Sequence, residues 1–128
     1  MSPEKTQELF DRFPELYRGR SKPLTESLMR FGFDHGDGWF DLVAELSQQI
    51  DDLAKAARLS GDDYPEAVQV KEKFGGLRFY TEGVPDEIYA AINAAEAKSI
   101  ETCEVCGRPG KQTNDGWIRT LCENCNGG

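Results

Sequence analysis

Residues 103–125 read CEVCGRPGKQTNDGWIRTLCENC, and this stretch holds every cysteine of the chain in two CxxC pairs with 15 residues between them. Two pairs at this separation match the spacing of a structural zinc site, in which four thiolates bind one tetrahedral ion. A positive φ at Gly107 would turn backbone amides toward the sulfurs. Two disulfides or a redox-active CxxC are the alternatives, but paired spacing at both ends is more typical of zinc. The predicted zinc ligands are Cys103, Cys106, Cys122 and Cys125.

Four cysteine ligands would close this metal site, because they fill the coordination shell and leave no position for water. We therefore expect the zinc to be structural and not catalytic. Between the pairs, Asn114-Asp115-Gly116 is a turn signal, and Trp117 to Leu121 contains strand formers. A zinc ribbon or knuckle is thus expected as a subdomain over residues 101–128, with residues 1–100 forming the main domain.

The composition places limits on partners and on location. The 128 residues include 23 acidic and 15 basic side chains, a net charge of −8, and 38% of them are hydrophobic, which is enough for one packed domain. There is no apolar run of membrane-spanning length and no signal-peptide pattern, so a cytoplasmic location is expected. The acidity disfavours generic nucleic-acid binding and favours a basic protein partner, although it would also simply keep a protein in solution.

Residues 1–100 carry clear helix and hairpin signals. Ser2 and Pro3 predict the start of a helix that Pro14 ends. Apolar residues at spacings of three and four predict a long amphipathic helix over about 39–58, capped by Asp37. Residues 65–82 predict a β-hairpin that reverses at Phe74-Gly75-Gly76, and a second main helix is expected over 85–99. The predicted fold is α+β, with two main helices on a small antiparallel sheet.

The glycine-rich loop before the long helix is the one place where a histidine meets two carboxylates. Asp34, His35 and Asp37 could form a catalytic or metal-binding loop. The alternative is a turn in which Asp37 caps the helix and His35 is exposed. No second histidine or nucleophilic serine stands in a recognisable arrangement, so catalysis is disfavoured. Trp39 is expected in the core, whereas Phe40 has a different helical phase and could anchor a partner.

Basic and aromatic residues interleave in the hairpin. Lys71, Lys73 and Arg78 alternate with aromatic side chains over residues 70–80, a pattern that platforms for single-stranded nucleic acid use. The simpler interpretation is strand alternation, which places one set inward and the other outward. We favour the simpler interpretation.

Three segments in order resemble a known family. FGFDHGDGWF at 31–40, VKEKFGGLRFY at 70–80 and the CxxCG tail are similar to small proteins encoded by bacteriophages and prophages. The resemblance covers roughly residues 28–125. That family has no characterised function, so the resemblance implies a phage context and no catalytic residues.

Three functional hypotheses follow from the sequence. The first is a phage-type accessory protein with one structural zinc that binds and inhibits or modulates a host or defence protein, including a nucleic-acid-handling complex. The second is a nucleic-acid-binding regulator that uses the hairpin and the zinc ribbon, and the third is a small hydrolase built on the histidine loop. The predicted partner-binding residues are Asp34, His35, Asp37, Phe40, Lys71, Lys73 and Arg78.

Overall fold

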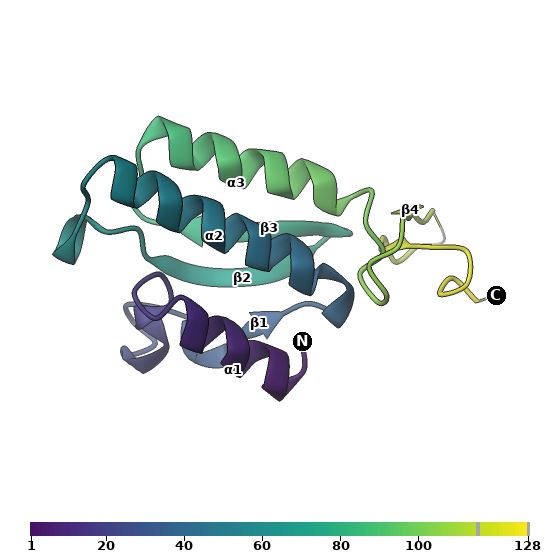
Figure 1. Cartoon of the computed structure of the whole chain (residues 1–128). Coiled ribbons are helices and arrows are strands. Elements are labelled where there is room, and N and C mark those ends of the chain that lie inside the picture. The colour runs from purple at the N-terminus through teal and green to yellow at the C-terminus, as the bar shows by residue number, and fades with distance from the viewer. Residues whose placement is uncertain (115, 128) are drawn as a thin grey trace.

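The computed structural model describes residues 1–114 and 116–127, and it contains three α-helices, a three-stranded sheet and a two-stranded ribbon (Figure 1). The α-helices are α1 (Pro3–Arg12), α2 (Phe40–Ala56) and α3 (Asp86–Ser99). The strands are β1 (Phe33–Asp34), β2 (Ala67–Lys73), β3 (Gly76–Thr81), β4 (Lys111–Gln112) and β5 (Thr120–Leu121). The predicted α+β class is confirmed. None of the described helices combines the length and the apolar character needed to cross a bilayer.

The first helix begins and ends where the sequence predicts. The Ser2 hydroxyl accepts a hydrogen bond from the Lys5 amide at 3.3 Å, and Pro3 occupies the first turn, where no amide is needed. The helix ends at Arg12, and its C-cap residue, Phe13, stands directly before Pro14. Leu9 and Phe13 are buried, so this helix packs on the core through one face.

The long helix also forms as predicted, but its start differs. A 3₁₀ turn over Asp37–Trp39 leads directly into α2, and no side chain caps that helix. The predicted cap by Asp37 is therefore wrong. Because the 3₁₀ turn carries this residue away from the amides of α2, its carboxylate instead accepts a hydrogen bond from the Ser2 amide at 2.8 Å. Trp39 is fully buried, as expected.

The sheet is mixed and not wholly antiparallel. Strands β2 and β3 form the predicted hairpin, and both turn residues have positive φ, 54° at Phe74 and 82° at Gly75, as in a type I′ turn. Strand β1 pairs in parallel with β2 through Phe33 and Val70. Only two residues long, β1 is too short to give an alternating pattern in the sequence.

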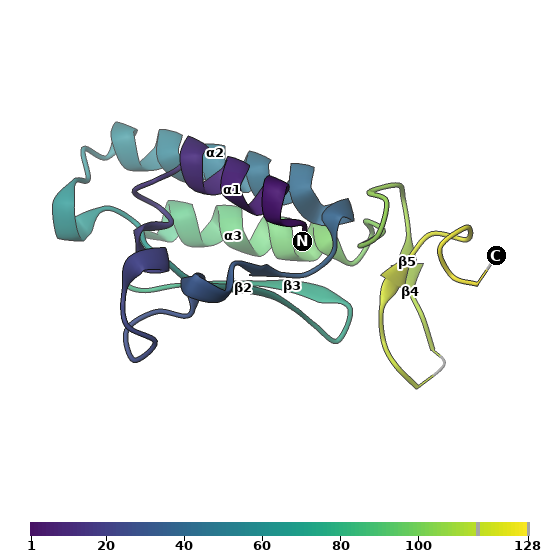
Figure 2. The same ribbon diagram turned by 90° about the horizontal axis from the view of Figure 1, so that it is seen from below.

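The three α-helices lie on one side of the sheet, as Figure 2 shows. Val70, Leu77 and Phe79 point toward the helices and are buried in the core. By strand alternation and pairing, Lys71 and Arg78 point to the opposite side. No α-helix of the described part of the chain covers that side, which we call the open face.

Backbone groups at both edges of the three-stranded sheet are hydrogen-bonded to groups outside the sheet. The N-terminal ammonium donates hydrogen bonds to the carbonyl oxygens of Phe33, at 3.0 Å, and of His35, which flank the β1 edge. On the β3 edge, the Leu77 amide donates to the Ser99 hydroxyl at 2.8 Å, and the Phe79 amide donates to a carboxylate of α3 at 2.9 Å. The acceptor in the second bond is Glu96. Side chains of α3 thus seal an edge that would otherwise present free amides.

Candidate metal centre

The two CxxC pairs bring four sulfur atoms together. All four Sγ atoms lie within 4.8 Å of one another, and those of Cys106 and Cys122 are 3.5 Å apart. A tetrahedral ion with metal–sulfur bonds of about 2.3 Å requires sulfur–sulfur separations of about 3.8 Å. The cysteines are free thiols and not disulfides. The cluster therefore has the dimensions of a four-thiolate metal site, as the spacing predicted.

Each pair sits in a tight backbone turn. In the first, the Gly107 amide donates to the Cys103 carbonyl at 2.9 Å, and Gly107 has the predicted positive φ of 81°. In the second, the Asn126 amide donates to the Cys122 carbonyl at 3.1 Å. The ribbon of β4 and β5 joins the two turns, although its strands are shorter than predicted. The turn expected over residues 114–116 includes Asp115, which lies outside the described residues.

The electrostatics of the cluster also fit a cation. Burial raises the pKa of the Cys103 thiol, but hydrogen bonds from nearby backbone amides outweigh burial and lower this pKa to about 6. The hydrogen bond to Cys122, burial and the neighbouring thiolate raise the pKa of Cys125 to about 12. Four thiols this close cannot all ionise unless a positive charge shares their centre, which is how a metal ion deprotonates its cysteine ligands.

The first cysteine pair rests on the glycine-rich loop. The Gly38 amide donates to the Glu104 carbonyl at 2.8 Å, and the Gly36 amide donates to the Glu104 carboxylate at 2.9 Å. The Trp39 indole donates to the Thr102 carbonyl at 2.8 Å. A Cβ at Gly38 would lie 2.2 Å from the carbonyl oxygen of Cys103, and a Cβ at Gly36 would lie 2.4 Å from the carbonyl oxygen of Glu104. Both glycines are therefore required by a close approach of two backbones.

Both strands of the ribbon contact the hairpin turn. The Thr120 hydroxyl donates to the Gly75 carbonyl at 2.6 Å, and the Gln112 amide side chain donates to the Phe74 carbonyl at 3.1 Å. A Cβ at Gly75 would lie 3.2 Å from atoms of Ile118 and of the next residue. We call these two contacts, at residues 36–38 and at residues 74–75, the glycine seats.

The glycine seats explain residues whose role the sequence left open. Two of the motifs that carry the family resemblance, at residues 31–40 and 70–80, contain the seats on which the metal centre rests. This role was not predicted from the sequence, although the closely spaced glycines in each motif were a signal of close backbone approach. The boundary predicted between residues 100 and 101 stays a prediction, and several hydrogen bonds cross it.

The structure contradicts the interpretation of the glycine-rich loop as a turn in which His35 is exposed. His35 is only 6% exposed and lies between the rings of Phe33 and Trp39, with centroids 6.0 and 5.5 Å away. Its Nδ1 donates to the Gly36 carbonyl at 2.8 Å, and its Nε2 has no hydrogen-bond partner among the described residues. Burial lowers the pKa of His35 to about 4. Exposure was therefore the wrong expectation for this residue.

The two carboxylates of the loop are separated from the histidine. Asp34 is exposed on β1, and Asp37 accepts from the Ser2 amide. In the described part of the chain, neither carboxylate is hydrogen-bonded to His35. Phe40 is half-buried, with the Lys5 ammonium 4.7 Å from its ring centroid.

The three hairpin cations lie on the open face. Lys71 and Arg78 are directly opposite each other in the β2–β3 register, and Lys73 follows on the same face at the hairpin tip. Both members of the opposed pair are half-buried, whereas Lys73 is exposed. Asp34 lies beside Lys71 in the β1–β2 register, so the structure groups it with the three cations and separates these four predicted residues from Asp37 and Phe40.

Comparison with protein-family models, with curated proteins and with solved structures gave no match to this chain. The resemblance to phage-encoded proteins therefore stays a prediction.

Proposed function

We propose that this protein is a zinc-stabilised binding protein, in which one structural ion holds the tail and the molecule works by recognising a partner. The observation that supports this is the cluster of four Sγ atoms within 4.8 Å. Zinc is the proposed metal because it prefers four sulfur ligands in tetrahedral geometry. Four protein ligands leave no open position for a substrate, so the ion would stabilise structure instead of performing chemistry.

Elemental analysis of freshly purified, reduced protein tests the metal directly. We expect about one zinc per chain, and loss of that zinc in Cys122→Ser. Ser60→Ala, an exposed substitution far from the sulfurs in sequence, serves as the control and should keep the metal. Metal-free protein with crosslinked cysteines would contradict the zinc assignment.

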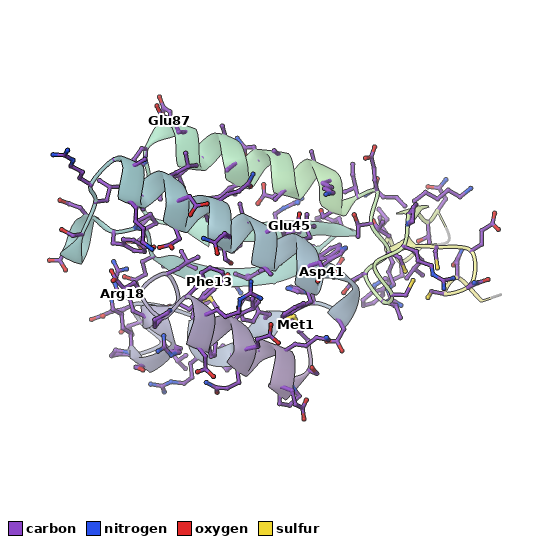
Figure 3. The ribbon with its side chains drawn as sticks, viewed as in Figure 1. Met1, Phe13, Arg18, Asp41, Glu45 and Glu87 are labelled. Carbon is purple, nitrogen blue, oxygen red and sulfur yellow. The ribbon has the colours of Figure 1, made fainter. Side chains whose placement is uncertain are left out.

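A groove beside the metal centre supports a role in partner binding. It has a volume of about 440 Å³ and lies between the start of α2 and the first cysteine pair. Three carboxylates border it, from Asp37, Asp41 and Glu45, together with Lys5 and Lys98. Figure 3 shows that Asp41 and Glu45 extend from the end of α2 nearest the tail. A zinc ion with four thiolates would add a charge of about −2 beside it.

The chemistry of this groove favours a basic protein element as the partner. Phe40, Leu42 and Val105 contribute apolar surface between the charges, so the groove can take a side chain with an apolar stem and a cationic head. With the resemblance to phage proteins, this leads us to propose a host or defence protein that handles nucleic acid as the target. The acidic groove would bind the basic surface that normally holds nucleic acid, and so inhibit the target.

We propose recognition and not catalysis because the histidine loop lacks a working arrangement. His35 is buried, and the carboxylates of Asp34 and Asp37 do not orient it. A hydrolase would need an accessible base within hydrogen-bond reach of its substrate. The groove beside the metal centre is the better candidate for function.

Co-purification from host lysate, compared between the wild type and variants that lack charges, tests whether the groove binds the partner. Asp41→Asn with Glu45→Gln removes two groove charges, and Asp62→Asn with Asp63→Asn removes the same charge from an exposed turn elsewhere. We expect a basic protein that is retained by the wild type and by the second variant, and is lost from the first. Equal retention by both variants would contradict the assignment of the groove.

A further inference from the structure

The open face carries three cations, Lys71, Lys73 and Arg78, and among the described residues their one side-chain hydrogen bond is from Arg78 to the Leu77 carbonyl at 3.1 Å. Lys71 and Arg78 stand directly opposite each other across β2 and β3, an arrangement of like charges that destabilises a sheet. In the described part of the chain, Lys71, Lys73 and Arg78 form no ion pair with an acid. Asp34 lies beside Lys71 in the β1–β2 register and shares this face, so the described strand residues of the open face carry three positive charges and one negative charge in a chain of net charge −8.

The hairpin tip holds an aromatic ring in an unfavourable backbone conformation. Phe74 has a φ of 54°, a region that bulky residues rarely adopt and that asparagine or glycine would fill without strain. Its ring is nevertheless 64% exposed, so packing in the core does not explain the choice. The Lys73 ammonium lies 5.6 Å from the ring centroid. A strained residue that displays an exposed ring points to a contact made by that ring.

Further exposed aromatic surface adjoins these cations. Tyr80 is 39% exposed and shares the open face with Arg78, two residues earlier. Ile118 packs beside the hairpin turn, and the next residue toward the N-terminus, Trp117, is 75% exposed on the zinc ribbon. Cations that could contact phosphates therefore lie beside aromatic rings that could stack on bases. The strand residues of both sets lie on the side of the sheet opposite to α2 and its acidic groove.

We propose that the open face, from Tyr80 to the hairpin tip at Phe74, binds single-stranded nucleic acid. Lys71, Lys73 and Arg78 contact phosphates, and Phe74 and Tyr80 stack on bases. Stacking on aromatic rings with a basic track is the general mode by which proteins hold single strands with little sequence preference. This function goes beyond the binding of a protein in the acidic groove, and it uses none of the groove residues.

Fluorescence anisotropy with labelled oligo(dT) and oligo(U) of roughly ten nucleotides tests the proposal. With about three phosphate contacts, the affinity should fall roughly 20-fold between about 50 and about 200 mM salt. Arg78→Gln and Lys71→Gln should each weaken binding and reduce this salt dependence by about one third. The matched controls are Arg58→Gln and Lys55→Gln, exposed cations on the far side of the sheet, which should change neither.

Phe74→Asn separates binding from folding. Asparagine tolerates the positive φ at this position, so the variant should melt at a higher temperature than the wild type. Loss of the stacking ring should nevertheless weaken binding by about 10-fold or more. A purely structural role for the ring would instead leave affinity unchanged. The zinc content serves as a check that the neighbouring ribbon is intact.

Three outcomes would overturn the proposal. These are no binding of either oligonucleotide at low salt, binding that Arg78→Gln and Phe74→Asn leave intact, and binding of polyglutamate without binding of either oligonucleotide. The last would identify an acidic protein as the occupant of the open face. Preference for oligo(U) or for oligo(dT), with the same dependence on Phe74, supports the proposal and identifies the natural strand as RNA or DNA.

Discussion

Replacing Gly38 by alanine should separate the first cysteine pair from its glycine seat. The added Cβ would lie 2.2 Å from the Cys103 carbonyl oxygen and 2.5 Å from the Glu104 carbonyl carbon. Both are backbone atoms, so no side chain can move aside, and the two segments must separate by about 1 Å or more. Gly38 has no positive φ, so the effect would come from this contact and not from backbone strain.

The expected magnitude follows from two opposing effects. Overpacking costs about 1–3 kcal/mol, and loss of the 2.8 Å hydrogen bond from the Gly38 amide to the Glu104 carbonyl costs about 1 kcal/mol. Alanine restricts the unfolded chain and returns up to about 1 kcal/mol. The net destabilisation is therefore about 1–4 kcal/mol. At about 3–4 °C per kcal/mol, the melting temperature should fall by about 3–16 °C.

Thermal melting and metal transfer to a chromophoric chelator measure both consequences. Because the clash is with a ligand residue, we expect metal release to be faster by about 10-fold, which corresponds to about 1.4 kcal/mol of the strain. Gly61→Asn is the control, since Gly61 has a φ of 57° that asparagine tolerates, and a Cβ there meets no atom within 4 Å. An alanine variant with unchanged melting and unchanged metal release would refute the glycine seat.

Three further changes test other parts of the structure. The pKa of His35 falls from its ordinary 6.5 to about 4 on folding, so the unfolded chain takes up the proton first and stability is lost as the pH falls through this window. Urea titrations between about pH 7.5 and pH 4 should show that the free energy of unfolding falls by about 3 kcal/mol more in the wild type than in His35→Gln. The same pH dependence of that free energy in both proteins would contradict burial of the neutral ring. Removal of metal by a chelator, or by Cys122→Ser, should make the ribbon sensitive to protease while the helical circular dichroism of the main domain largely persists, because the large core contains none of the cysteines. Ser99→Ala should cost about 1–3 kcal/mol by leaving the buried Leu77 amide without an acceptor, against less than about 0.5 kcal/mol for Asn93→Ala at an exposed position of the same helix. Equal melting temperatures for those two variants would show that the edge amide finds another partner.

The sequence predicted those elements whose signal is local. The helix that begins after Ser2, the amphipathic helix that contains Leu46 and Ile50, and the hairpin around Gly75 each have a periodic pattern or a turn residue within the segment itself. The four-cysteine cluster was predicted for the same reason, because ligand spacing is a local property.

What the sequence did not predict depends on contacts between distant segments. A two-residue strand at Phe33 pairs only because β2 lies beside it, and Asp37 leaves its expected cap because the start of α1 offers an amide nearby. The seats at Gly36 and Gly38 are defined by the backbone of the cysteine pair, about 65 residues later in the chain. Burial of His35 likewise requires Phe33 and Trp39 to close around it.

The sealed sheet edges restrict how any partner can bind. Many proteins capture extended peptides by adding them as an extra strand, through main-chain hydrogen bonds that depend little on sequence. Here the amides of Leu77 and Phe79 are already bonded to α3, and the carbonyls of Phe33 and His35 to the terminal ammonium. A visiting strand would first have to displace those groups. Strand addition would have to compete with these bonds, which favours selection of partners by side-chain chemistry and makes recognition sensitive to single substitutions on the partner.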